Sequence, residues 1–332
     1  MSSLHPPVEP YDQGLLDVGD GNRIHWETCG NPHGKPALVL HGGPGSGASP
    51  FTRRLFDPDR YRIVLLDQRG AGRSTPPASA YDTDMSVNTL PKLLADLELL
   101  RAHLGIERWL VWGVSFGSVL ALRYAQTHRD AVSELVLTGL ATGSQEEVDL
   151  MARGLGKVFP EAFAEFADGV PAEERDGDLT AAYNRLLESP DPAVRERAAL
   201  AWTDWETAVA SQPQRSVPRY QDPDFRYGFA RTVTHYWSRG HFLDAPDTVL
   251  RDLPLLAGLP AVIVQGKVDL GNLLGIPWRV AAAWPDAELV VVDDAGHNAG
   301  APGITDELVA ALDRFAGQGR LSGRDAVEGT SP

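Results

Sequence analysis

Several features are scarce in this sequence, and each scarcity excludes a class of protein. Cys29 is the only cysteine among 332 residues, so the chain has neither an intramolecular disulfide nor a cysteine-based metal site. No uninterrupted apolar run approaches the length of about 20 residues that a membrane-spanning helix needs. Lysine and arginine total 30 against 45 aspartate and glutamate, giving a net charge of −15 without a basic cluster. That balance argues against nucleic acid and anionic membranes as partners.

The first residues also lack a targeting signal. Residues 1–12 are polar and contain prolines, without the basic and apolar regions of a signal peptide. We therefore expect a cytoplasmic location. With 332 residues, of which 43% are hydrophobic, the chain has the size of one large domain or of a domain with an insertion.

One stretch carries a chemical pattern. Residues 109–114 form an apolar run of strand length, and residues 119–125 place apolar and small side chains at helical spacing. Between them lies Gly113-x-Ser115-x-Gly117, the nucleophile-elbow pattern, in which the glycines let strand and helix approach closely while a strained turn exposes the serine. So short a pattern also arises by chance, but the flanking runs support it. It predicts that Ser115 is a nucleophile.

Other apolar runs predict the fold class. Residues 15–18 and 23–28 flank a turn and indicate an antiparallel hairpin. Apolar runs without alternation, which end in glycine-bearing loops, are typical of a parallel sheet covered by helices on both faces. These runs occupy residues 37–40, 61–66, 109–114, 134–139, 261–266 and 288–292. The sequence therefore predicts an α/β protein with a mostly parallel central sheet.

The amino-acid composition changes in the middle of the chain. Residues 143–246 are charged and rich in alanine and tryptophan, which predicts an inserted helical cap over the sheet. We expect a first core segment at 1–142, the cap at 143–246, a second core segment at 247–318, and a disordered tail at 319–332.

An activated serine needs a histidine base and a carboxylate that orients it. Asp269 and His297 each follow an apolar strand, at the same sheet edge as Ser115. The chain order Ser, Asp, His and this placement are those of the α/β-hydrolase fold. Asp293 and Asp294 are rival acids, but they directly precede the histidine, from where reaching its Nδ1 atom is awkward.

Two backbone N–H groups complete this predicted centre. The glycine-rich residues 41–45 follow a strand, where backbone N–H groups can point at an anion. We assign an oxyanion hole to the N–H groups of Gly43 and of Phe116, the residue after the nucleophile. A simple tight turn stays an alternative for Gly45 and Gly47.

At this point the chain resembles the proline iminopeptidase family of α/β-hydrolases. The resemblance implies release of an N-terminal residue, typically proline, from a small peptide or amide with a free amine, without a metal or other cofactor. It also implies that Glu206, at the end of a tryptophan-rich stretch, binds the substrate's α-amino group. The matching motifs occupy residues 30–32, 40–45, 67–70, 125–128, 159–161, 201–206, 264–266 and 295–297.

The chain also departs from the family pattern. The family's second amine-binding glutamate, in Ala-Arg-Ile-Glu-Asn-His-Tyr-Phe, falls on Val233. The ring after the nucleophile is Phe116 instead of tryptophan, and residues 270–277 replace a shorter link. These changes favour a larger or more apolar acyl residue, or an unusual amide. The residues expected to contact substrate are Glu206, Trp202, Trp205, Val233, Tyr236 and Gly42.

The sequence thus predicts a serine aminopeptidase or amidohydrolase that works through an acyl-enzyme. Three alternatives stay open: an amidohydrolase that removes an aminoacyl group from a secondary metabolite, a carboxylester hydrolase, and a non-catalytic binding protein of the same fold. Intact Ser115, Asp269 and His297 argue against the last of these.

Overall fold

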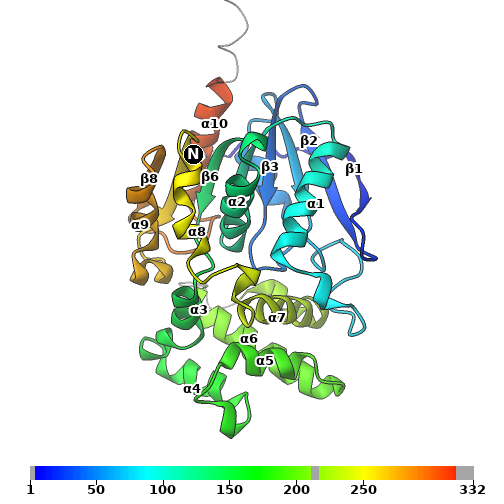
Figure 1. Cartoon of the computed structure of the whole chain (residues 1–332), viewed down its shortest axis with the longest axis vertical. Helices are drawn as coiled ribbons and strands as arrows, with labels where there is room; N and C mark the ends of the chain where they lie inside the picture. Colours follow the sequence, from blue (N-terminus) through cyan, green and yellow to red (C-terminus); the bar gives the residue numbers. More distant parts are fainter. Residues whose placement is uncertain (1–3, 211–216, 319–332) are drawn as a thin grey trace, which may run out of the picture.

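The computed structural model describes residues 4–210 and 217–318. At its centre is an eight-stranded sheet in the order β1-β2-β4-β3-β5-β6-β7-β8 (Figure 1). β1 pairs antiparallel with β2, β2 pairs antiparallel with β4, and all other neighbours are parallel. The predicted fold class and the N-terminal hairpin are confirmed. The strands are β1 (Pro10–Asp17), β2 (Arg23–Gly30), β3 (Lys35–Leu40), β4 (Tyr61–Leu66), β5 (Trp109–Val114), β6 (Val132–Thr138), β7 (Ala261–Gly266) and β8 (Ala287–Val292).

Helices cover both faces of the sheet, which explains why the apolar runs of its central strands do not alternate with polar residues. One face packs on a helical layer that contains α1 and α2, and the other packs on α10. No helix in the described ranges is both long and apolar enough to cross a membrane. The helices are α1 (Leu90–His103), α2 (Phe116–Thr127), α3 (Gln145–Ala152), α4 (Pro160–Asp168), α5 (Leu179–Leu187), α6 (Pro192–Ala210), α7 (Pro223–Trp237), α8 (Thr248–Arg251), α9 (Ile276–Ala283) and α10 (Pro302–Gln318).

Helices α3 to α7, called here the cap helices, lie between β6 and β7 in the chain and gather at one end of the sheet (Figure 1). Aromatic rings form their core. Phe166 stacks on Tyr183 at 4.6 Å and on Trp205 at 5.2 Å between ring centroids, and such pairs add about 0.5–1.5 kcal/mol beyond burial. The domain boundaries stay a prediction, and the predicted disordered tail at 319–332 lies outside the described residues.

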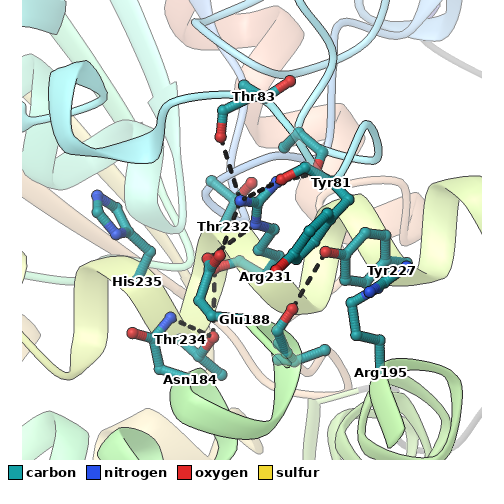
Figure 2. A network of polar contacts seen from close by, with 12 residues as sticks. Tyr81, Thr83, Asn184, Glu188, Arg195, Tyr227, Arg231, Thr232, Thr234 and His235 are labelled. Carbon is teal, nitrogen blue, oxygen red and sulfur yellow. Dashed lines mark hydrogen bonds and ion pairs between the residues drawn. The ribbon is translucent and has the colours of Figure 1, made fainter. Parts of the chain in front are cut away.

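Arg231 ties the cap helices to the rest of the molecule (Figure 2). From α7, its buried guanidinium donates to the carbonyls of Ala78 at 3.0 Å and Ala80 at 2.9 Å, and pairs with Glu188 at 2.8 Å. One turn further along α7, Tyr236 Oη donates to Asn88 Oδ1 at 2.9 Å. A buried charge of this kind is stable only when all of its partners are present. These contacts therefore fix α7 relative to the sheet.

Candidate active site

Ser115 lies at the sharp turn between β5 and α2. Its φ of 56° and ψ of −123° are unfavourable for a residue with a side chain, and such a conformation costs about 1–3 kcal/mol. The flanking glycines make the turn possible. A Cβ atom on Gly113 would lie 2.3 Å from the carbonyl oxygen of Gly117, and one on Gly117 would lie 2.2 Å from that of Leu40. The strain is thus concentrated at the predicted nucleophile.

Asp269 and His297 lie together at the same end of the sheet. His297 Nδ1 is 2.8 Å from Asp269 Oδ2. Asp269 also accepts hydrogen bonds from the Gly271 N–H at 2.9 Å and from Gln265 Nε2 at 3.0 Å. Because a carboxylate only accepts, the proton of neutral His297 belongs on Nδ1, which leaves Nε2 free to act as a base. Burial raises the pKa of the Asp269 carboxyl, but the charge of His297 and these hydrogen bonds outweigh burial and hold that pKa below its usual value.

The rival acids have other surroundings. Asp293 Oδ1 pairs with Lys267 Nζ at 2.7 Å, and both side chains are mostly exposed. Asp294 is exposed as well. The geometry therefore favours Asp269 as the partner of His297.

The candidate oxyanion hole depends on how His41 is oriented. The Gln68 N–H donates to His41 Nε2 at 3.0 Å, so the proton of the imidazole lies on Nδ1, which donates to the carbonyl of Gly42 at 2.9 Å. Because a trans peptide is planar, the N–H of Gly43 points opposite to that carbonyl. Phe116 opens α2, where the first N–H groups have no helical partner. Both predicted donors are therefore available to an oxyanion.

Two hollows meet at Ser115. The inner hollow, about 120 Å³, is enclosed mainly by apolar side chains that include Val119, Leu140 and Trp237. The outer hollow, about 580 Å³, opens between the glycine loop at residues 42–49 and residues 297–300. Residues that line both hollows are Gly43, Ser115, Glu206, Ala210 and His297.

Glu206 is the acid at this junction. Burial raises the pKa of its carboxyl to about 7, while the charge of His297 and the indole N–H of Trp202 act in the opposite direction. That indole nitrogen has no well-formed hydrogen bond among the described residues. A bound ammonium group would stabilise the ionised form of Glu206. The site is thus suited to a cation that arrives with the substrate.

Four of the six predicted substrate contacts lie away from the described linings of the two hollows. Of the six residues expected to contact substrate, Glu206 and Gly42 line the hollows beside Ser115. The others are absent from the described linings of both hollows and are buried in packing clusters; they are Trp202, Trp205, Val233 and Tyr236. Helical geometry explains the position of Trp205, because successive residues of a helix point about 100° apart, so a helix that aims Glu206 at the hollow turns Trp205 away.

The inner hollow also contains a residue that the sequence did not indicate. His241 has a positive φ of 55° without being glycine, and its ring stacks on that of Phe116 at 5.8 Å. Burial lowers the pKa of its imidazole to about 4, so His241 is neutral at physiological pH. His241 lies in no motif and at no characteristic spacing from the other site residues, so the sequence does not distinguish it from an ordinary loop histidine. No cluster of His, Cys, Asp and Glu in the described part of the chain could hold a metal ion.

The charges at the site predict its pH dependence. Asp269 and, to a lesser degree, Glu206 raise the pKa of His297, and the predicted roles of the two residues require neutral His297 and ionised Glu206. We expect kcat/KM for a prolyl arylamide to fall below about pH 7. The fall should be steeper than the titration of one group would produce, because His297 and Glu206 both gain a proton. In Glu206→Gln, the removal of a negative charge should lower the pKa of His297. The fall of kcat/KM should then occur at lower pH and follow the titration of a single group. A profile from pH 5 to 9 tests this, and an identical limb in both enzymes would contradict it.

Comparisons with known proteins agree with this geometry. The family model described as "alpha/beta hydrolase fold" matches residues 35–302. The chain is 69% identical over 317 residues to a probable proline iminopeptidase of Streptomyces coelicolor, covering 95% of this chain and 98% of that protein. It is 44% identical to a proline iminopeptidase of Xylella fastidiosa, covering 95% and 100%. The crystal structure of VinJ superimposes with a TM-score of 0.66 at 17% identity, covering 93% and 99%, which shows a shared fold.

Proposed function

Because the chain belongs to the proline iminopeptidase family of α/β-hydrolases, we propose that it releases the N-terminal residue, proline first of all, from small peptides by serine hydrolysis. The observation that carries this proposal is the carboxylate of Glu206 at the junction of the two hollows, beside Ser115 and His297. An aminopeptidase must bind an ammonium group next to the bond that it cleaves. A partly buried carboxylate at that point supplies the binding energy.

The described residues support a two-step reaction. His297 Nε2 takes the proton of Ser115 Oγ as that oxygen attacks the prolyl carbonyl carbon. The N–H groups of Gly43 and Phe116 stabilise the resulting oxyanion. Protonated His297 then donates its proton to the departing peptide nitrogen, and the carbon–nitrogen bond breaks to leave an acyl-enzyme. Water, deprotonated by His297, attacks this ester, and the serine recovers its proton as proline leaves.

The inner hollow supports a compact acyl residue. Its small volume and its mainly apolar wall suit a pyrrolidine ring better than a long side chain. Val233, where the family has its second acid, lies in the core of the cap helices. We infer that Glu206 carries most of the amine recognition in this chain.

The alternative functions have less support. An ester hydrolase would use the same serine and oxyanion hole, but it would gain nothing from a buried acid at the acyl pocket. The removal of an aminoacyl group from a metabolite differs only in the leaving group, and no feature of the described residues favours it over a peptide. A cytoplasmic location stays a prediction.

The exchange Glu206→Gln tests the proposal. Leaving a partly buried ammonium group without its carboxylate partner costs roughly 2–5 kcal/mol. Because each 1.4 kcal/mol corresponds to about a tenfold change, kcat/KM for a prolyl arylamide should fall by about 30-fold or more. N-acetylation of the substrate should harm the wild type far more than the variant. Steady-state kinetics on the two substrates measures both effects.

Asp204→Asn is a matched control, since this acid lies two residues away on α6 and faces a surface hollow with Glu165 and Arg197. We expect it to behave as the wild type. Equal turnover of free and acetylated substrates by the wild type would contradict the aminopeptidase proposal and support an ester hydrolase.

A further inference from the structure

The outer hollow contains a positive charge that the proposed reaction has not used. Arg219, in the short helical turn Pro218–Gln221, lines this hollow together with Ser46, Ser49 and Asn298. Among the described lining residues, Arg219 is the one lysine or arginine and Glu206 the one acid. The two fixed charges of the hollow therefore have opposite sign, and Glu206 is the one that lies at the candidate nucleophile.

The guanidinium of Arg219 is held in place without a carboxylate. Its Nη1 donates to the carbonyl of Ser46 at 2.7 Å, and its plane lies over the ring of Phe225 at 4.7 Å. No acidic side chain of the described ranges lies within 4.0 Å of it. Other arginines of the molecule do have such partners, as Arg53 has Glu27 and Arg231 has Glu188. Within residues 4–210 and 217–318, one of its five N–H donors has a hydrogen-bond partner, and a planar guanidinium can bind a carboxylate through the remaining ones.

The place of this charge relative to the scissile bond is set by the glycine loop. Ser46 N–H donates to the carbonyl of Gly42, and a Cβ atom on Gly43 would lie 2.9 Å from the nitrogen of Ser46. The residue that holds Arg219 is therefore packed against the residue that supplies one candidate oxyanion donor. Since Ser115 and Arg219 line the same hollow and consecutive Cα atoms are only about 3.8 Å apart, a short leaving group that extends from Ser115 enters the hollow that this guanidinium lines.

We propose that Arg219 binds the C-terminal carboxylate of the leaving residue, so that the preferred substrates are dipeptides and other very short peptides with a free carboxyl end. This inference rests on the proposed aminopeptidase function and extends it to the recognition of the substrate's C-terminal end. Glu206 would bind the ammonium end and Arg219 the carboxylate end. A guanidinium recognises a carboxylate with two parallel hydrogen bonds, which a neutral amide end cannot match.

A matched pair of substrates tests the proposal: the dipeptide Pro-Ala and its C-terminal amide. We expect the wild type to cleave the free acid with a kcat/KM about tenfold or more above that of the amide, mainly through a lower KM, because a hydrogen bond to a charged group is worth at least a tenfold change. In Arg219→Gln this preference should disappear, because kcat/KM for the free acid should fall to about the value for the amide. Arg219→Lys, which retains the charge, should retain part of the preference.

Arg153→Gln is the control variant. Arg153 also donates to backbone carbonyls, of Arg175 and Gly177, and lies over a phenyl ring, that of Phe163, but it lines a different hollow in the cap helices. It should leave the preference intact.

The outcomes separate the two proposals. Equal kcat/KM for acid and amide in the wild type would overturn the role of Arg219 and leave the aminopeptidase intact. A parallel loss on both substrates in Arg219→Gln would show that Arg219 only supports the loop at Ser46, which also overturns it. Failure of the wild type to cleave either substrate would refute the proposed function and this inference with it.

Discussion

Alanine in place of Ser115 should lower kcat by about a million-fold while leaving the fold intact, as the loss of a triad serine does in other hydrolases. The reason is that Ser115 Oγ forms the covalent bond to the acyl group, so no step of the proposed reaction proceeds without it. Hydrolysis of a prolyl arylamide measures the loss. His297→Ala should be equally harmful, and the double variant no worse, because members of a triad act as a unit.

Stability provides the control for this result. The Ser115 side chain has no structural hydrogen bond among the described contacts, and alanine keeps the Cβ atom and the strained φ of 56°. The melting temperature should therefore change little. A fluorophosphonate, which reacts with activated serines, should label the wild type and not Ser115→Ala. Labelling of both proteins would mean that another residue is the nucleophile.

Asp269→Asn should lower kcat by about ten-thousand-fold, the effect of the same exchange in a serine protease triad. Gln265 explains why asparagine fits so poorly. Its Oε1 accepts from the Leu140 N–H at 2.9 Å, so its Nε2 must face residue 269. In one orientation the new amide would place an N–H₂ group against Gln265 and His297, and in the other against the Gly271 N–H. Neither orientation both satisfies these donors and leaves His297 Nε2 as the base.

Asp293→Asn is the matched control for that exchange. Its partner Lys267 is exposed, and surface pairs contribute little, so activity should stay near the wild-type level. The opposite pattern, a large loss in Asp293→Asn and a small one in Asp269→Asn, would transfer the role of the triad acid to Asp293.

The sequence was sufficient to predict the fold and the contact between Asp269 and His297. Gly113 and Gly117 are required by contacts of less than 2.5 Å, so the spacing of glycines around Ser115 reports a backbone geometry directly. Asp269 and His297 each follow an apolar strand, and parallel strands bring their carboxyl ends to one edge. Local sequence patterns therefore predict which residues lie at such a site.

The walls of the hollows were harder to predict, because they depend on which way each helix faces. Trp205 and Glu206 are neighbours in the sequence, yet Trp205 donates its indole N–H to the carbonyl of Met151 inside the cap helices while Glu206 lines both hollows. The same holds on α7, where Thr232 faces Gly45 and Val233 is buried among the cap helices. Family resemblance identified Glu206, but it gave no indication of His241 or Arg219.

The lone cysteine has a practical consequence. Cys29 is fully buried in β2, and burial raises the pKa of its thiol to about 12, so almost none of it is thiolate, the reactive form, at neutral pH. We therefore expect the folded protein not to react with maleimides, even when Cys29 is left in place. A cysteine introduced at Leu273, which is 62% exposed and close in sequence to Leu270 in the wall of the inner hollow, would be the single point of attachment for a fluorophore. Binding of substrate could then be followed by fluorescence in an otherwise native chain.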